Sequence, residues 1–143
     1  MKFLLDTNIC IYIIKKKPEQ VFEKFRGLAV GSVAISSVTL AELHYGIAKS
    51  ANPEKNREAL DRFLTPIEII DFGAESTEEY GKIRAELERK GITIGPLDTL
   101  IAAHARSLDL ILVTNNEKEF SRVLVSALRI GFSKSNGENT AQQ

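Results

Sequence analysis

The chain has 143 residues, of which 43% are hydrophobic and 27% are charged. That length suits one ordinary domain with one core, and no apolar run approaches the roughly 18 residues of a membrane span. Nineteen basic and nineteen acidic side chains cancel, so the net charge gives no sign of a nucleic-acid partner. A single cysteine, Cys10, excludes an internal disulfide. With Asp6 where a signal peptide needs apolar residues, we expect a cytoplasmic protein with no membrane partner.

Short apolar runs alternate with helical patterns in the first half of the chain. Asn8 and Asn52 are the expected caps of two of the helices, because an Asn side chain accepts a backbone N–H at a helix start. Pro53 then takes the first helical position, where its missing N–H costs nothing. The expected elements are a strand over 3–5, a helix over 9–14, a short helix over about 21–25 that Gly27 terminates, a strand over 33–36, a helical hairpin over about 39–64 and a strand over 67–70.

The second half continues the alternation and then changes character. Residues 77–90 give the clearest helix pattern, with acids in the first turn and basic residues in the last. A further helix is expected over 95–105 and an almost wholly apolar strand over 110–113. Apolar strands alternating with helices predict an α/β fold with a parallel sheet flanked by helices on both faces. We expect one domain over residues 1–132 and a disordered polar tail over 133–143.

Polar side chains follow several of these strands directly. In open α/β sheets, ligands bind outside the carboxyl ends of the strands, so these positions are candidates for a site. Asp6 ends the first strand, Glu42 lies about one helical turn after the second, and Asn116 follows the fourth. Asp98 lies in the first turn of the preceding helix, and Glu119 lies one turn into the helix after the fourth strand. We expect these groups to face one crevice if the strands are neighbours.

Each candidate also has a purely structural interpretation. Thr39 and Glu42 have the spacing of a capping box, in which the Glu only satisfies a backbone donor. Asp98 suits the positive end of a helix dipole. Glu119 is compatible with a solvated helix acid, and Asn116 with a turn or cap. Asp6 is the hardest to explain this way, because a charged residue directly after an apolar strand is seldom structural.

The residue types at these positions favour one kind of chemistry. His44 faces away from Glu42, His104 is expected to be packed among alanines, and one cysteine cannot complete a zinc site. No phosphate-binding glycine loop or nucleophilic serine elbow is present. Oxygen ligands suit Mg²⁺ or Mn²⁺. Two carboxylates about 4 Å apart repel by about 4 kcal/mol at an effective dielectric near 20, which a cation would offset. Hydrolysis of a phosphate ester fits such a site best.

Four segments, in order and spacing, resemble the motifs of PIN-domain ribonucleases of the VapC toxin kind. They are LLDTN at 4–8, ISSVTLAEL at 35–43, IGPLDTLIAAHA at 94–105 and LVTNNEKEF at 112–120. Each motif alone is weak, but four in order are specific. The similarity spans about residues 1–130.

The resemblance implies a PIN fold with a parallel sheet of four or five strands. It implies a Mg²⁺-dependent endoribonuclease toxin, with Mn²⁺ as a substitute, that cuts structured RNA such as the tRNA anticodon stem-loop. Its implied partners are a VapB-type antitoxin and a second copy of the toxin, with larger toxin–antitoxin assemblies. By position, the catalytic and metal-binding residues it implies are three core acids, Asp6, Glu42 and Asp98. Many relatives carry Asp where this chain has Asn116, which leaves Glu119 as the candidate for a fourth catalytic and metal-binding acid. The substrate-binding residues it implies are Thr7, Asn8, Thr114 and Asn116.

Two other functions are compatible with a small α/β domain. A catalytically inactive PIN-like RNA-binding or interaction module would keep the fold and lose an acid, but all three core acids are present. A phosphoacceptor receiver domain would need paired acids after the first strand. Asp6 followed by Thr7 and Asn8 fits that pattern poorly.

Overall fold

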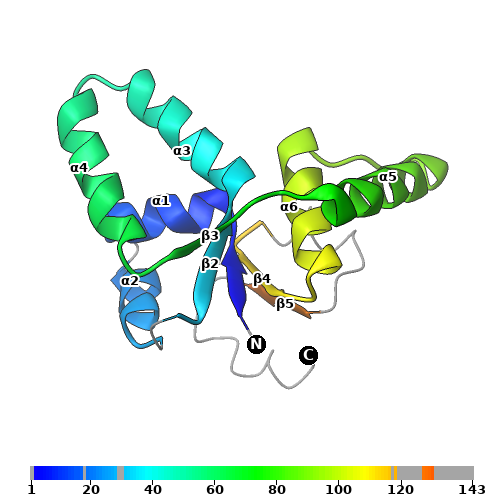
Figure 1. Ribbon diagram of the computed structural model, residues 1–143, viewed down its shortest axis with the longest axis horizontal. Coiled ribbons are helices and arrows are strands. Elements are labelled where there is room, and N and C mark those ends of the chain that lie inside the picture. Colours follow the sequence, from blue (N-terminus) through cyan, green and yellow to red (C-terminus); the bar gives the residue numbers. More distant parts are fainter. Residues whose placement is uncertain (1, 18, 29–30, 117, 119–126, 131–143) are drawn as a thin grey trace.

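The computed structural model describes residues 2–17, 19–28, 31–116, 118 and 127–130. Strands and helices alternate through most of this chain, as the hydrophobic pattern predicts (Figure 1). The elements are β1 (Phe3–Leu5), α1 (Thr7–Lys15), α2 (Glu19–Arg26), β2 (Val33–Ser36), α3 (Ser37–Ala48), α4 (Pro53–Leu64), β3 (Glu68–Ile70), α5 (Ala74–Arg89), α6 (Pro96–Ser107), β4 (Ile111–Thr114) and β5 (Ala127–Ile130).

The five strands form one sheet in the order β3-β2-β1-β4-β5, and all neighbours are parallel. The first strand along the chain is therefore the central one. Leu4 pairs with Ala34 on one side and with Leu112 on the other. Because the chain leaves β1 toward β2 and later returns on the opposite side of β1 as β4, the strand order reverses at β1. Such a reversal is where open α/β sheets form a ligand crevice.

Neighbouring residues of the central strands point to opposite faces of the sheet, and each face has its own core. Leu5 and Val113 belong to a cluster that includes Cys10 of α1 and Leu60 of α4. The preceding residues, Leu4 and Leu112, belong to a second cluster, formed with α5 and α6. The sheet is thus buried on both sides, as expected for apolar parallel strands.

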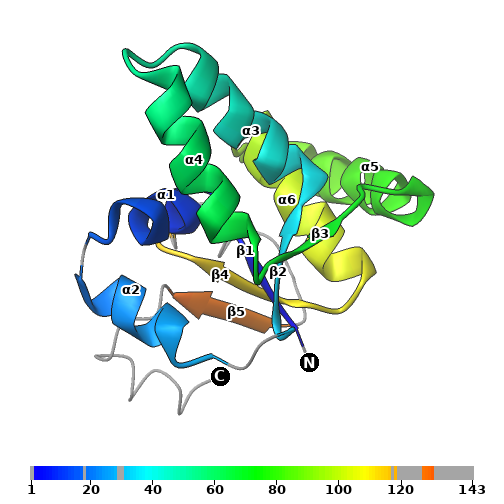
Figure 2. The ribbon, with the colours of Figure 1, turned by 60° about the vertical axis from the view of Figure 1, so that its left-hand side comes forward.

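The helices divide between the two faces of the sheet. Figure 1 shows α1, α2, α3 and α4 on one side and α5 and α6 on the other. In Figure 2 the α3–α4 hairpin projects away from the sheet, beyond the helices that lie against it. The α/β architecture with helices on both faces is confirmed. Among the described residues, no helix combines the length and the apolar character needed to cross a membrane.

Some predicted helix boundaries were wrong. Asp6, and not Asn8, caps α1, because its side chain accepts the backbone N–H of Ile9 at 2.9 Å. α5 begins at Ala74, three residues before the predicted start. Its cap, Gly73, offers no side-chain hydrogen bond, so no polar side chain marks this start in the sequence. Asn52 caps α4 as predicted.

Beyond residue 126, the described part of the chain consists of one element. The fifth strand, Ala127–Ile130, pairs in parallel with β4. The predicted polar tail over 133–143 lies outside the described residues.

We expect Leu112→Ala to lower the free energy of unfolding by about 3–5 kcal/mol, because it leaves a cavity beneath a central strand. Leu112 is fully buried, whereas Leu108 is 36% exposed. Leu108→Ala is therefore the matched control, with an expected loss of about 1 kcal/mol or less. Urea unfolding of the two variants measures both values. Equal losses would contradict the position assigned to Leu112.

Candidate active site

The candidate site lies at the carboxyl ends of three parallel strands. Asp6 follows β1, Ser36 ends β2, and Thr114 ends β4. The backbone N–H of Asp6 donates to the carbonyl oxygen of Val113 at 3.0 Å, so the ends of β1 and β4 remain paired where the polar residues begin. Side chains from segments more than a hundred residues apart in the sequence therefore meet at one edge of the sheet.

Asp6 is the most buried acid of the site, with 3% of its surface exposed. Its two carboxylate oxygens have different partners. Oδ1 accepts the backbone N–H of Ile9, and Oδ2 accepts the hydroxyl of Thr114. Burial raises the pKa of Asp6 above its ordinary value, and the charge of Glu42 adds to the rise, while the hydrogen bonds from Thr114 and Ile9 oppose it. The fold thus places a carboxyl group where its charged form is disfavoured.

Glu42 accepts a hydrogen bond from a residue of α1 and is not a capping residue. The side chain of Ser36 caps α3 by accepting the backbone N–H of Val38 at 3.0 Å. The capping-box interpretation of Thr39 and Glu42 is therefore wrong, because both residues lie inside the helix. Instead, the hydroxyl of Thr7 donates to Oε1 of Glu42. This contact connects the first turn of α1 to the second turn of α3.

Asp98 lies in the first turn of α6, as the sequence predicts. Its Oδ2 accepts a hydrogen bond from the side-chain amide of Asn116 at 3.2 Å. The backbone N–H of Asn116 in turn donates to the Thr114 hydroxyl at 2.7 Å. Because that hydroxyl donates to Asp6, one chain of hydrogen bonds runs from Asp6 through Thr114 and Asn116 to Asp98.

Not every predicted site residue is placed with the others. Asn8 has an exposed side chain beside the buried Asp6, and Glu119 lies outside the described residues. Among the residues that are described, no three His, Cys, Asp or Glu side chains lie close enough to form a metal-binding group. Hydrogen bonds thus connect Asp6 to Asp98 through Thr114 and Asn116. Glu42 interacts with Asp6 through its charge, which raises the pKa of Asp6.

The donor set fits a hard divalent cation. The groups at this edge of the sheet are carboxylate, hydroxyl and amide oxygens, which Mg²⁺ and Mn²⁺ prefer. Burial raises the pKa of Asp6, and the charge of Glu42 adds to the rise; a bound cation would favour the charged form of this carboxyl. The two histidines do not compete for this role, since His44 is exposed and His104, as predicted, is packed, with its ring edge-on to Phe72.

Sequence reasoning missed one residue of this region. Thr39 was considered only as a cap, but it is fully buried, and its hydroxyl lies 3.3 Å from that of Thr7. A signal for this was present, because Thr39 precedes Glu42 by three positions and so shares its face of the helix. A buried polar residue on that face suggests a partner in the same crevice.

Comparison with known proteins places the chain in a family. A model of the PIN domain matches residues 3–124. The chain is 52% identical over 123 residues to a Shigella flexneri protein called tRNA(fMet)-specific endonuclease VapC, which covers 86% of this chain and 92% of that one. It is 51% identical over 124 residues to ribonuclease VapC2 of Rickettsia felis, with the same coverage of 86% and 92%.

Solved structures give the same result. The chain superposes on VapBC2 of Rickettsia felis bound to a DNA fragment from its promoter, with a TM-score of 0.84 and 48% identity over 90% of this chain and 98% of that one. DNA-bound VapBC of Salmonella typhimurium gives a TM-score of 0.84 and 45% identity, with coverage of 90% and 97%. The chain therefore belongs to the PIN domain family and, within it, to the VapC-type ribonucleases.

Proposed function

We propose that this chain is a metal-dependent endoribonuclease toxin that acts in the cytoplasm and is neutralised by an antitoxin. One observation carries the proposal: a buried carboxylate, Asp6, is connected by hydrogen bonds to Asp98 and faces the charge of Glu42 at the strand-order reversal. Carboxylates gathered in this way repel one another unless a cation joins them. The names of the VapC relatives supply the substrate class, RNA.

In the proposed site, Asp6, Glu42 and Asp98 hold the cation, with Glu119 as a fourth ligand. When bound, Mg²⁺ or Mn²⁺ lowers the pKa of a coordinated water and offsets charge on the phosphate oxygens. The other residues hold the ligands in position. Their contacts are those of Thr7 with Glu42, of Thr114 with Asp6 and of Asn116 with Asp98. Such supporting contacts limit how far a ligand can rotate.

For the substrate we propose a tRNA cut in its anticodon stem-loop. The Shigella flexneri relative is named for tRNA(fMet), which makes initiator tRNA the first RNA to test. The sequence suggests Thr7, Asn8, Thr114 and Asn116 as substrate contacts, but Thr114 is fully buried against Asp6, so we propose for it only the positioning role. Among them, Asn8 presents an exposed side chain directly after the buried Asp6, where it can reach a phosphate or base of an RNA bound at the acids.

The proposed antitoxin, of the VapB type, docks in an apolar groove beside the acids. A groove of about 300 Å³ lies between α1, α3 and α4, with Ile11, Ile47 and Leu60 among its lining residues. Leu43, which also lines it, directly follows Glu42. A segment bound there can therefore extend to the acids and block them. The solved relatives are toxin–antitoxin complexes, and we propose that this chain forms a homodimer that joins a larger assembly of that kind.

Activity is the first test of the proposal. We expect the purified chain to cut initiator tRNA with Mg²⁺ or Mn²⁺ and to stop with EDTA. Asp98→Asn should lower the rate on the order of 100-fold or more, because it removes charge stabilisation from the transition state. Asp61→Asn, at a surface ion pair with Arg57, is the matched control and should cut normally. Undiminished cutting by Asp98→Asn would remove Asp98 from the proposed metal site, whereas no cutting by wild type would favour the non-catalytic RNA-binding module.

The second test concerns stability and pH. The pKa of Asp6 is raised in the folded state, so its protonated form stabilises the fold at low pH, and that stability is lost as pH rises through the raised value. Asp6→Asn keeps a neutral group, whose amide can still contact Ile9 and Thr114. Without metal, the melting temperature of the variant minus that of wild type should therefore increase from pH 4 to pH 7.

Metal should reverse this difference. At pH 7, added Mg²⁺ should raise the melting temperature of wild type more than that of Asp6→Asn, because only wild type keeps the full charge of the site. Differential scanning fluorimetry across pH, with and without Mg²⁺, measures both effects. A difference that stays constant with pH and is unaffected by Mg²⁺ would remove Asp6 from the proposed metal site.

The antitoxin groove has its own test. Gly46 lines the groove, and a Cβ atom added there meets no atom within 4 Å, as is also true of Gly81 on α5. Gly46→Gln should therefore fold, fill the groove and weaken binding of the antitoxin encoded beside this chain at least tenfold, while RNA cleavage persists. Gly81→Gln is the matched control and should bind normally. Calorimetric titration gives both affinities, and equal values would place the antitoxin elsewhere.

A further inference from the structure

A second cavity lies on the other face of the sheet, near the acids. The α5–α6 cavity has a volume of about 200 Å³. Its walls are Tyr80, Arg84 and Glu88 of α5, and Pro96 and Thr99 of α6. Figure 1 shows these two helices beside one another, on the side of the sheet opposite α1, α3 and α4, which line the antitoxin groove.

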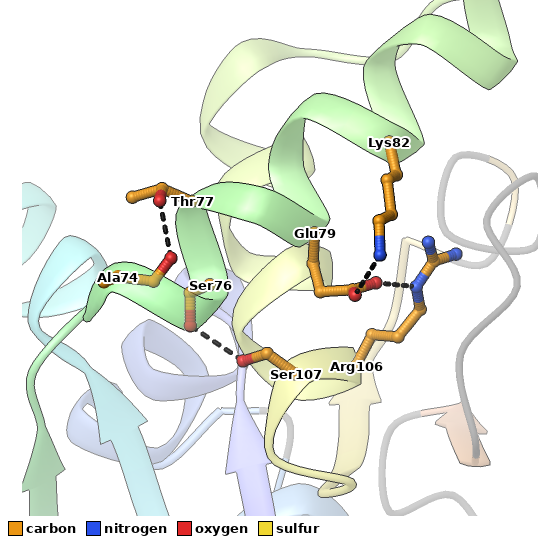
Figure 3. A network of polar contacts seen from close by, with 7 residues as sticks. All are labelled: Ala74, Ser76, Thr77, Glu79, Lys82, Arg106 and Ser107. Carbon is orange, nitrogen blue, oxygen red and sulfur yellow. Dashed lines mark hydrogen bonds and ion pairs between the residues drawn. The ribbon is translucent and has the colours of Figure 1, made fainter.

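Polar contacts at the far end of the two helices hold the walls of this cavity together. Ser76 near the start of α5 contacts Ser107 at the end of α6, with 2.7 Å between the hydroxyl oxygens (Figure 3). Nearby, Arg106 pairs with Glu79, and its hydrogen bond holds the pKa of that carboxyl below its ordinary value. The helices therefore run antiparallel, and the cavity lies at their opposite end, where α6 begins.

The start of α6 also carries Asp98. Pro96 and Thr99, which line the cavity, stand on either side of Asp98 in the sequence. Along the axis of α6, the backbone positions of both lining residues therefore lie within one helical turn, about 5.4 Å, of Asp98. The cavity and Asp98 thus lie at the same end of α6.

The chemistry of the cavity suits a planar, uncharged ring. The planar Arg84 guanidinium donates two hydrogen bonds, from Nε to Oε2 of Glu88 and from Nη1 to the Tyr80 hydroxyl, each 3.1 Å. Guanidinium planes and aromatic rings are the groups on which unpaired bases stack. Leu87 and Ile94 add apolar surface.

The same contacts argue against a phosphate as the occupant. Glu88 already balances the charge of Arg84, and its carboxylate would repel a second anion. That carboxylate has further lone pairs that can accept a hydrogen bond from the edge of a base. The volume is below the 300 Å³ or so at which pockets begin to take drug-sized ligands, and it suits a single ring system.

We propose that the α5–α6 cavity binds one unpaired nucleobase of the RNA, next to the phosphate held at the acids. The proposal rests on the proposed ribonuclease function and deepens it, because it adds a contact between the protein and one base of the RNA substrate. Arg84 stacks on the base, Glu88 accepts a hydrogen bond from its edge, and the polar contacts between α5 and α6 keep the two walls in place.

Binding without cleavage gives the first arm of the test. Fluorescence anisotropy would measure the affinity for a single-stranded RNA hexamer of mixed sequence and for a hexamer made entirely of abasic nucleotides, with EDTA present to prevent cleavage. Wild type should bind the hexamer about tenfold more tightly than the abasic chain, a difference within the range that the stacking of one base contributes to binding. Arg84→Ala should lose most of this preference. Arg89→Ala removes the same charge from an exposed residue of α5 outside the cavity lining, and should keep it.

Cleavage gives the second arm. With one abasic nucleotide placed at each position beside the mapped cut, wild type should show a roughly tenfold higher KM at a single position, with kcat little changed, and Arg84→Ala should show no such position. If wild type and Arg84→Ala share one profile, or if their hexamer preferences agree, the inference is overturned. If wild type does not cut RNA at all, the ribonuclease function fails, and the binding arm still decides the cavity.

Discussion

The fold and the candidate site both depend on one buried carboxylate. Asp6 ends the central strand, starts α1 by accepting the backbone N–H of Ile9, and accepts the hydroxyl of Thr114 from the neighbouring strand. Burial makes its charged form unfavourable, which raises its pKa. A fold selected for stability alone would not place a carboxylate there, because an amide could accept the Ile9 N–H and donate to the Thr114 hydroxyl without the charge. The proposed function explains the position by the cation that the charge would bind.

The rest of the architecture serves to bring distant segments to this point. Parallel strands end on the same edge of the sheet, and the central position of β1 gives it one neighbour from early in the chain and one from late. The separate cores on the two faces fix the register, since a shift of one residue would turn Leu4 and Leu5 to the wrong sides. The polar side chains at the strand ends are thereby fixed as well.

The sequence predicts the layers of this fold well, because apolar strands and helical spacing are local signals. It predicts helix starts poorly where polar residues follow one another. Asp6 and Asn8 can each cap α1, as Ser36 and Thr39 can each cap α3, and the choice depends on where the chain leaves the sheet. The place of Asp6 directly after a strand is a local signal, but the partners of the candidate acids could not be predicted from the sequence. Thr7 and Glu42 are 35 residues apart, and only the packing of α1 against α3 joins them.

The pairing of β1 with β4 has a consequence for the synthesis of the chain. Thr114 completes the surroundings of Asp6 from 108 positions away, and α6 with Asp98 comes only shortly before it. A growing polypeptide that has emerged from the ribosome as far as α5 contains Asp6, Glu42 and β2 but neither Asp98 nor β4, the second neighbour of β1. The ribosome therefore synthesises most of the chain before the acids can meet, and the proposed RNA-cleaving activity, if built on them, would be absent from an incomplete product.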